Sequence, residues 1–434
     1  MTRTIVVNEL ARVEGHGGIE VEMKGDDVAN VKFNVFEGQR LLETLLNGRP
    51  CMDVAPTISR ICAICSAAHF VTSLQATEAA FGTTVTAQTA RLRELLFRGE
   101  NIESHALHIF LLAAPDYLGY PSATDMAKDY PQIVKLGLEL KQLGNALQEV
   151  IGGRAVQPVN PVLGGFARLP TVEQLVDLRD RLAAAVARVP MLLDFVAALP
   201  AERGCQADTV FVALAPEQYG YTSAADVVFL EATQRTAFQP SDYRMFTNEQ
   251  AIKHSNAKHS SYRNQPYMVG ALARLTINGQ RLAGSAAERM KQIGLMLPSA
   301  DPLDNNKAQA IELVYDLEWC LQTIQGFLDH GIHQETPVAV LPRAGTGTSI
   351  TEAPRGLLVH SYTYNEEGRI VAADIITPTA MNAASVERHF RYAVEQSPDK
   401  SDAVLTRRLE MIARAYDPCI SCSVHMVRLK RDAG

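Results

Sequence analysis

Two Cys-x-x-Cys pairs lie near opposite ends of the chain, Cys62 with Cys65 and Cys419 with Cys422. A spacing of two residues lets both sulfurs of a pair face one metal ion, and four thiolates complete the coordination sphere of a soft or borderline transition metal. Cys65 and Cys419 are 354 positions apart, far more than the loop of a zinc ribbon. A site built from both pairs forms only when nearly the whole chain has folded, which favours the centre of an enzyme over a small structural module.

The composition is typical of a globular protein of 434 residues, with 47% hydrophobic and 21% charged residues. The net charge is −7 and no basic stripe is present, which argues against a nucleic-acid partner. No run approaches the ~18 apolar residues of a membrane span, and the N-terminus has neither a secretion signal nor a twin-arginine pattern. Seven cysteines, an odd number, argue against a disulfide framework. We therefore expect a cytoplasmic protein with no membrane span of its own.

The apolar periodicity predicts a mainly α protein, a single large helical-bundle domain with small β-hairpins near both ends. Helical spacing is clearest in five stretches, Phe70–Ala80, Ala90–Leu112, Gln132–Ile151, Val172–Leu199 and Ala286–His330. Shorter helices are expected over Gln39–Asn47, Ala384–Gln396 and Ala403–Tyr416. Alternating residues predict one hairpin within Gly18–Phe36 and another from Leu357–Thr363 and Ile370–Thr377. Such a bundle would bring its two end segments together over one site.

Three further motifs accompany the cysteines: R-x-E-G-H at Arg12–His16, E-A-P-R-G at Glu352–Gly356, and T-P-T at Thr377–Thr379. The cysteine motifs themselves read R-x-C-x-x-C-x-x-x-H and D-P-C-x-x-C-x-x-H. This ordered set resembles the large, catalytic subunit of nickel–iron hydrogenases, and most closely its soluble cytosolic NAD(P)-linked subgroup. The resemblance implies a hydrogenase large-subunit domain over residues 1–425 and a C-terminal tail, 426–434, that a maturation protease removes.

The resemblance implies reversible, heterolytic cleavage of dihydrogen into protons and electrons. Cys62, Cys65, Cys419 and Cys422 match the four nickel ligands, and Cys65 and Cys422 also match the ligands of an iron that carries one carbon monoxide and two cyanides. Soft sulfur donors suit nickel through changes of oxidation state. A cationic metal also keeps thiols deprotonated at neutral pH.

Four residues match groups that act on the proton or on dihydrogen. The Cys419 thiolate is implied as the first proton acceptor, and Glu14 as the next station toward solvent. Arg355 matches the guanidinium held over the open metal position, with Asp417 orienting it.

Four more residues match positions that surround the metals. His69 is implied as a hydrogen-bond donor to a bridging sulfur. Pro354 matches a residue beside the guanidinium. Thr379, with the backbone around Pro378, matches the group that donates a hydrogen bond to a cyanide.

A second metal ion and several partner proteins are also implied. Glu43, His425 and the backbone carbonyl of Ile375 match the ligands of a magnesium or iron ion, a sparse set that suits the several waters magnesium keeps. Four of the seven cysteines are assigned to nickel, so no iron–sulfur motif remains in the chain. Electrons must therefore leave through the clusters of an iron–sulfur small subunit. In the NAD(P)-linked relatives they then pass through flavin- and NAD(P)-binding diaphorase subunits. A maturation protease and nickel chaperones complete the expected partners.

Three positions depart from the pattern of the family, and other functions compete with the hydrogenase hypothesis. Ala63 stands where most members have glycine, Gln157 where we expect histidine, and Ser104 where many exported members have aspartate. The alternatives are a structural zinc scaffold and a metal-free precursor of the same large chain. The quinone-binding core subunit of respiratory complex I shares the fold but lacks the nickel cysteines, so the four cysteines here argue against it.

Overall fold

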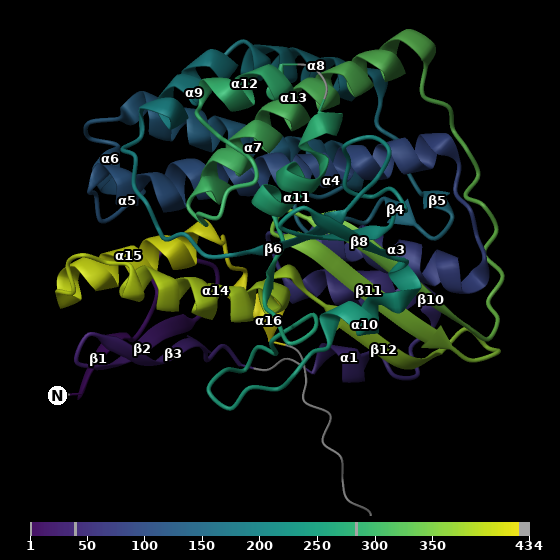
Figure 1. Cartoon of the computed structure of the whole chain (residues 1–434). Coiled ribbons are helices and arrows are strands. Elements are labelled where there is room, and N and C mark those ends of the chain that lie inside the picture. Colours follow the sequence, from purple (N-terminus) through teal and green to yellow (C-terminus); the bar gives the residue numbers. More distant parts are fainter. Residues whose placement is uncertain (1, 39–40, 283–284, 425–434) are drawn as a thin grey trace, which may run out of the picture.

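The computed structural model describes residues 2–38, 41–282 and 285–424 (Figure 1). Its helices are α1 (Leu42–Leu45), α2 (Val54–Ile58), α3 (Ser66–Phe81), α4 (Ala87–Leu107), α5 (Ala114–Leu118), α6 (Ala123–Met126), α7 (Pro131–Gly152), α8 (Val172–Val186), α9 (Val189–Ala198), α10 (Tyr243–Thr247), α11 (Ala271–Asn278), α12 (Ala286–Gln292), α13 (Asp304–His330), α14 (Pro378–Glu395), α15 (Asp402–Ala415) and α16 (Ile420–Ser423). Its strands are β1 (Thr2–Val7), β2 (Gly17–Lys24), β3 (Asp27–Val35), β4 (Pro161–Val162), β5 (Gly165–Phe166), β6 (Val210–Leu214), β7 (Val227–Glu231), β8 (Gln234–Phe238), β9 (Tyr267–Met268), β10 (Gly345–Ala353), β11 (Gly356–Tyr364) and β12 (Ile370–Ile376). The prediction of a mainly α protein is confirmed.

The long helices α4, α7, α8 and α13 pack against one another in the upper part of Figure 1. Helix α4 begins after Thr86, whose hydroxyl accepts a hydrogen bond from the backbone N–H of Thr89 at 3.1 Å. Helices α4 and α7 lie close together because Gly144 carries no side chain. A Cβ there would lie 2.5 Å from the carbonyl oxygen of Gly99. This layer forms the roof over the segments that carry the motifs.

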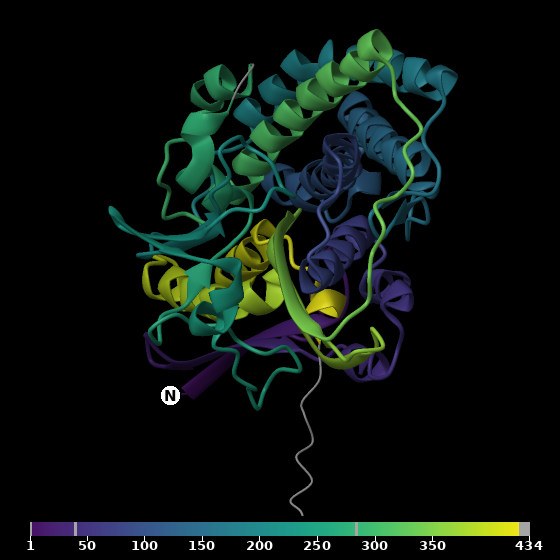
Figure 2. The same cartoon turned by 90° about the vertical axis from the view of Figure 1, so that its right-hand side faces the viewer.

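Two three-stranded antiparallel sheets lie below that roof, and each is covered by a helix. Strands β10, β11 and β12 form one sheet, with α3 packed on it, and β1, β2 and β3 form the other, with α14 packed on β3. Figures 1 and 2 agree that the purple N-terminal sheet lies beneath the yellow C-terminal helices. One hydrophobic cluster extends from Ile5 in β1 to Val424 after α16. Residues near both ends of the described part of the chain thus share one core.

Two predicted helices are broken by proline or glycine. The stretch 172–199 divides into α8 and α9, and Pro190 lies in the first turn of α9. Proline has no N–H and its ring clashes with the carbonyl four residues earlier, so one helix cannot continue through it. The stretch 286–330 divides into α12 and α13, and the residues between them include Gly294 with φ +65° and Pro298.

Several strands were not predicted, and the end hairpins are parts of larger sheets. Strand β1 extends the first hairpin and β10 extends the second. A four-stranded sheet in the order β8-β7-β6-β9 lies in the middle of the chain. The helix expected over 39–47 is shorter, since α1 begins at Leu42, and residues 39–40 lie outside the described part. Within the described ranges, no helix is long and apolar enough to cross a membrane.

Candidate metal centre

The four motif cysteines meet in one buried cluster. The Sγ–Sγ distances are 3.2 Å between Cys62 and Cys419, 3.1 Å between Cys65 and Cys422, and 2.7 Å between Cys419 and Cys422. All four side chains are buried, and none forms a disulfide. The sequence prediction that pairs from opposite ends of the chain converge is therefore correct in the structure.

Local structure aims each pair at the cluster. Cys62 follows the short 3-10 turn Ser59–Ile61, and Cys65 directly precedes α3. Cys419 directly precedes α16, and Cys422 lies within it. The backbone N–H groups of Ile64 and Cys65 point at the Cys62 sulfur, at 3.3 and 3.4 Å. Such N–H groups stabilise a negatively charged sulfur.

The pKa values of the clustered cysteine thiols indicate that a cation is needed to keep more than one of them ionised. Hydrogen bonds from the thiols of Cys419 and Cys422 lower the pKa of Cys62 well below its ordinary value. Burial raises the pKa of Cys419 to about 11, and it also raises the pKa of Cys422. One thiolate is thus favoured in this dry site, and further thiolates require a compensating positive charge. The donor set fits a soft or borderline transition-metal centre.

The N-terminal segment closes over the second cysteine pair. The backbone carbonyl of Glu14 accepts a hydrogen bond from the N–H of Ile420 at 2.9 Å, and Glu14 pairs with Cys419 in a parallel bridge. Gly15 has φ +85°, and a Cβ there would lie 2.8 Å from the Cβ of Ile420. The glycine of the R-x-E-G-H motif therefore permits this close approach.

The Glu14 carboxylate binds Ser421, which lies between the two cysteines of the second pair. One oxygen accepts a hydrogen bond from the Ser421 backbone N–H at 3.0 Å, and the other accepts one from its hydroxyl. The Glu14 side chain is partly buried. This predicted acid therefore lies between the cysteine cluster and the exterior.

Arg355 and Asp417 form a buried, two-point ion pair. Arg355 Nε donates to the Asp417 carbonyl at 2.6 Å, and Nη2 donates to Asp417 Oδ1 at 2.9 Å. Burial opposes the charge of Arg355, but the charges of Asp417 and of the thiols Cys419, Cys65 and Cys62 raise its pKa. Arg355 Nη1 is buried and has no hydrogen-bond partner among the described residues. The guanidinium thus keeps one donor free beside the sulfurs.

Asp417 adopts a strained backbone. Its φ is +49°, uncommon for a residue with a side chain, and it directly precedes Pro418. Gln309 Nε2, on α13, donates to Asp417 Oδ2 at 3.0 Å. Its carboxylate is therefore held from both sides, by Arg355 and by Gln309, and such fixed strain is often found at functional sites.

The other predicted neighbours of the metals lie around the same cluster. Thr379 is in the first turn of α14, directly after Pro378, and its Oγ1 accepts a hydrogen bond from the Cys419 backbone N–H at 3.0 Å. His69 Nδ1 lies 3.1 Å from His360 Nε2. The roles of Thr379 and His69 toward metal ligands stay predictions.

Of the three residues predicted to bind a second metal ion, the structure describes Glu43 and Ile375. The Glu43 carboxylate accepts a hydrogen bond from the backbone N–H of Ile375 at 2.8 Å, and burial raises the pKa of Glu43 to about 7. Glu43 thus contacts Ile375 through its N–H, whereas the predicted ligand is its carbonyl oxygen, and the metal site stays a prediction. The third, His425, lies outside the described residues, as does the tail.

The sequence did not predict two residues that hydrogen-bond to the motif segments and fix their backbone, Glu100 and Arg274. Glu100, on α4, accepts hydrogen bonds from the N–H groups of Ala67 and Ala68 at the start of α3. Arg274, on α11, binds the carboxylate of Glu352 at 3.1 Å and the carbonyl oxygen of Pro354 at 3.0 Å, and so fixes the turn before Arg355. Neither belongs to a short motif, so no sequence signal indicates it.

The departures from the family pattern have defined places. The Gln157 N–H donates to the Ser66 hydroxyl at 2.9 Å, one residue from Cys65, and Gln157 has φ +58°. Ser104 is buried in α4, and its hydroxyl has no partner among the described residues.

Comparisons with known proteins agree with this geometry. The family model of nickel-dependent hydrogenases matches residues 40–176 and 220–425. In Pyrococcus furiosus, the alpha chain of sulfhydrogenase 1 is 38% identical over 98% of both chains, and the alpha chain of sulfhydrogenase 2 is 38% identical over 98% of this chain and 100% of its own. The vhu F420-non-reducing hydrogenase of Methanocaldococcus jannaschii has a subunit that is 28% identical over 90% of this chain and 98% of its own.

Solved structures show the same fold. An NAD+-reducing [NiFe]-hydrogenase in the H2-reduced state superposes with a TM-score of 0.87 at 24% identity, covering 98% of this chain and 99% of that chain. A [NiFeSe]-hydrogenase of Dm. baculatum superposes with a TM-score of 0.78 at 21% identity, covering 98% of this chain and 100% of that chain. With its four clustered cysteines, the chain belongs to the nickel-dependent hydrogenase family, as a large subunit.

Proposed function

We propose that this chain cleaves dihydrogen reversibly at a nickel–iron centre held by Cys62, Cys65, Cys419 and Cys422. Cys65 and Cys422 would bind both metals, and the iron would also carry one carbon monoxide and two cyanides. When bound, this group supplies the electrophilic centre at which dihydrogen is split heterolytically. The observation that best supports this proposal is that four buried thiols converge beside the Arg355 guanidinium, whose Nη1 donor is free among the described residues.

The chain's own residues would move the proton. Cys419 Sγ would hold it first, and the Glu14 carboxylate would pass it outward. Glu14 suits this task because its backbone pairs with Cys419 while its side chain is only partly buried. Its carboxylate is oriented by two hydrogen bonds from Ser421, so little reorganisation is needed when the proton arrives.

Arg355 would position and polarise what enters above the sulfurs. Two of its nitrogens are bound to Asp417, so its free Nη1 has a fixed direction. A fixed, desolvated cation stabilises developing negative charge more strongly than a mobile one. Pro354, Pro378, Thr379 and His69 would shape the rest of the cavity around the iron ligands.

A magnesium or iron ion at Glu43, Ile375 and His425 would join the C-terminal end of the fold to the sheet. The Glu43 carboxylate is partly buried, and although Lys258 lowers its pKa, burial still raises that pKa to about 7, so a divalent cation would favour the ionised form further. Nickel chaperones would deliver the nickel first, and a maturation protease would then remove the tail 426–434. The magnesium or iron ion would bind after that step.

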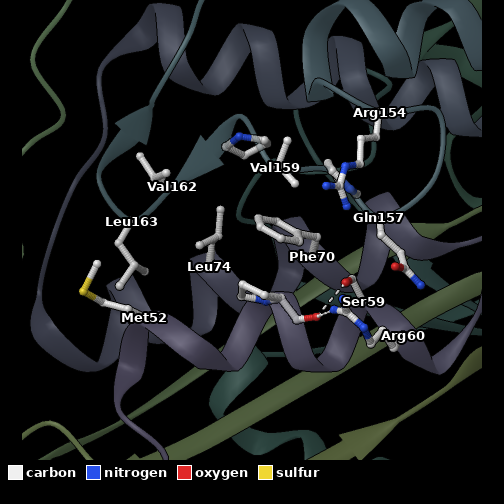
Figure 3. Close-up of a pocket in the computed structure, with 13 residues that line it drawn as sticks. Met52, Ser59, Arg60, Phe70, Leu74, Arg154, Gln157, Val159, Val162 and Leu163 are labelled. Carbon is white, nitrogen blue, oxygen red and sulfur yellow. Dashed lines mark hydrogen bonds between the residues drawn. The ribbon is translucent and has the colours of Figure 1, made fainter.

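An iron–sulfur small subunit would dock beside the first cysteine pair. A surface pocket of about 460 Å³ lies there, and Figure 3 shows Phe70, Leu74 and Leu163 along it, with Arg60 and Gln157 at one side. Met52, at its edge, is 76% exposed. Exposed apolar surface of this kind marks protein interfaces, and it lies beside the segment that leads to Cys62. Electrons could therefore leave by a short route.

The electrons would pass on to NAD(P) through flavin-binding diaphorase subunits in the cytoplasm. The similarity in fold to an NAD+-reducing [NiFe]-hydrogenase supports NAD(P) as the electron acceptor. The similarity in sequence to sulfhydrogenases supports sulfur compounds as an alternative acceptor. Reduction of NAD, NADP and sulfur by the purified complex, compared under dihydrogen, would identify the acceptor.

Infrared spectroscopy of the purified complex tests the central proposal. Carbon monoxide and cyanide bound to iron absorb where no protein group does, so such bands are expected in the mature complex. A complex that contains zinc in the cysteine cluster and shows no such bands would instead establish a structural zinc scaffold.

A further inference from the structure

Two histidines and a carboxylate form a second cluster of metal-binding side chains. His254 Nε2 lies 2.7 Å from Glu387 Oε1, and His259 Nδ1 lies 3.9 Å from Glu387 Oε2. The three donor atoms all lie within 4.8 Å of one another. Apart from the four cysteines, this is the one such group found in the described part of the chain. The nickel–iron chemistry does not use it.

The donor spacing suits a single ion. Zinc binds imidazole nitrogen and carboxylate oxygen at about 2.0–2.2 Å, so neighbouring donors of a tetrahedral site lie about 3.4 Å apart. The two observed separations, 2.7 and 3.9 Å, lie on either side of that value. Small side-chain rotations are therefore enough to admit the ion.

The backbone holds the donors in place before any ion binds. Glu387 is on α14, and the backbone N–H of Phe33, on β3, donates to Glu387 Oε1 at 2.8 Å. His259 exchanges two backbone hydrogen bonds with Gln250, both of 2.9 Å, which close the loop that carries both histidines. The N–H of Asn256, in the same loop, donates to the Val35 carbonyl at 2.8 Å. A fixed carboxylate and a pinned loop are features of a built site.

Exposure and protonation also suit a ligand set. The side chains of His254, Glu387 and His259 are 25%, 19% and 10% exposed, so the site is sheltered yet open to solvent on the His254 side. Burial lowers the pKa of His259 below its ordinary value, which favours the neutral imidazole that binds metals. A water molecule can complete the coordination from the open side.

We propose that His254, His259 and Glu387 bind one divalent transition-metal ion of the zinc class. Two imidazole nitrogens and one carboxylate favour zinc, cobalt or nickel over magnesium or calcium. The ion takes the place of the hydrogen between His254 Nε2 and Glu387 Oε1, and the neutral imidazole of His254 then carries its hydrogen on Nδ1. Once bound, the ion ties the loop to α14 and β3 and stabilises the folded chain by mass action.

Zinc titration of the mature complex tests this site. The nickel- and iron-loaded complex is used so that the four cysteines are occupied, and it is first dialysed against a chelator and then supplied with Zn²⁺. Zinc per chain is measured by mass spectrometry, together with the melting temperature. We expect one zinc equivalent that is absent or bound at least tenfold more weakly in His254→Gln and in Glu387→Gln, with a zinc-dependent rise in melting temperature only in the parent.

A matched control is His16→Gln. His16 Nδ1 lies 2.9 Å from Glu9 Oε1, so it forms a histidine–glutamate pair with no second imidazole. This variant should keep the zinc equivalent. Glu387→Gln retains an oxygen that accepts from Phe33, so its loss of zinc would reflect the ligand charge and not a broken strand contact. His254 is partly exposed, which keeps its variant informative if His259→Gln does not fold.

Cobalt substitution reports the donor type. Co²⁺ at this nitrogen and oxygen site should give visible ligand-field bands without the near-ultraviolet sulfur-to-cobalt band that a cysteine site produces. Zinc content in His254→Gln and Glu387→Gln equal to that of the parent would overturn the proposal, and so would sulfur-to-cobalt absorption that accounts for all the bound ion. Nickel content, measured in the same samples, separates this outcome from any failure of the nickel–iron proposal.

Discussion

The Glu14 carboxylate accepts a hydrogen bond from the backbone N–H of Ser421 at 3.0 Å, across 407 positions of sequence. Ser421 directly precedes Cys422, so an acid from the first motif is fixed beside a thiol of the last. The backbone of Glu14 pairs with Cys419 as well. One residue therefore both closes the C-terminal segment over the cluster and presents an acid next to it.

Changing Glu14 to Gln should separate these two tasks. The amide oxygen can still accept from Ser421, so nickel and iron should be retained, but an amide cannot pass a proton. Proton relays of this kind contribute about 100-fold or more to rate. We expect hydrogen–deuterium exchange by the metal-loaded variant to fall by that factor.

Glu9→Gln is the control for this experiment. Glu9 is 66% exposed and binds His16 instead of the second cysteine pair, so its variant should exchange at the parent rate. Parent-like exchange in Glu14→Gln, measured with full nickel content, would remove Glu14 from the proton path.

Changing Cys422 to Ser should abolish metal retention and hydrogen turnover together. Cys422 Sγ lies within 3.1 Å of two other sulfurs, and a hydroxyl is a much poorer ligand for soft metals. Nickel and iron content and turnover are measured in the same preparation. Cys51→Ser, at a buried cysteine outside the cluster, should leave both unchanged. Full activity in Cys422→Ser would contradict a bimetallic site at these cysteines.

Residues in motifs could be found from sequence, whereas residues that support them could not. The four cysteines, Glu14 and Arg355 stand in recognisable local patterns, and the structure brings them together. Glu100 and Arg274 have no local pattern. Their roles follow from which helix packs behind α3 and behind the turn at Pro354, and that is decided by tertiary packing.

The fold shows the same division. The long helix α7 carries strong apolar periodicity and was predicted to within one residue at each end, and the C-terminal end of α13 was predicted correctly at His330. Strand β10, with the sequence GTGTSITEA, contains small and polar residues that give no clear alternation, yet it is paired with β11 along its whole length. Its order comes from that pairing and from its packing on α3, neither of which is local in sequence.

Changing Arg355 to Lys should lower activity while the metals stay bound. Lysine keeps the charge but cannot bind both the carbonyl and the carboxylate of Asp417 with a planar fork. Loss of one fixed stabilising donor costs about 100-fold in turnover. Turnover and nickel content of the purified complex provide the measurement.

Arg369→Lys controls for the chemistry of the substitution. Arg369 is about half exposed and pairs with Glu367 at the surface, so its variant should keep parent activity. If Arg355→Lys turned over at the parent rate, the fork to Asp417 would have no part in the reaction.

Asp301 should contribute a loss of stability between about pH 4 and pH 6. Burial raises the pKa of Asp301 from 3.8 to about 6. In this window the unfolded chain has lost the proton and the folded chain still holds it, so a rise in pH favours unfolding. The loss is complete above pH 6 and amounts to about 3 kcal/mol. Denaturant titrations across this range should show it, and Asp301→Asn should make the pH profile flatter.

Asp399→Asn is the matched control for Asp301. Hydrogen bonding from the Ser401 backbone N–H lowers the pKa of the exposed Asp399. Ionisation of Asp399 therefore makes the folded chain more stable as the pH rises, which is opposite to the effect of Asp301. Removal of the Asp399 carboxylate therefore cannot flatten a fall of stability with rising pH. Equal pH profiles for the parent and Asp301→Asn would show that the buried carboxyl does not titrate in this window.

Changing Met52 to Asp should detach the iron–sulfur partner without loss of nickel. Met52 is 76% exposed at the edge of the apolar pocket beside the first cysteine pair, so a charge there would be buried in the proposed interface. We expect the affinity for the partner to fall about tenfold. This corresponds to about 1.4 kcal/mol of binding free energy, a modest loss for an interface residue. Copurification with a tagged chain measures the partner, and nickel content shows that the large subunit is intact.

Leu341→Asp, 75% exposed and outside the pocket lining, should keep the partner. Because the chain has no iron–sulfur motif, nicotinamide reduction should fall in parallel with the partner. An active single-subunit species that reduces a nicotinamide would contradict the proposed electron route.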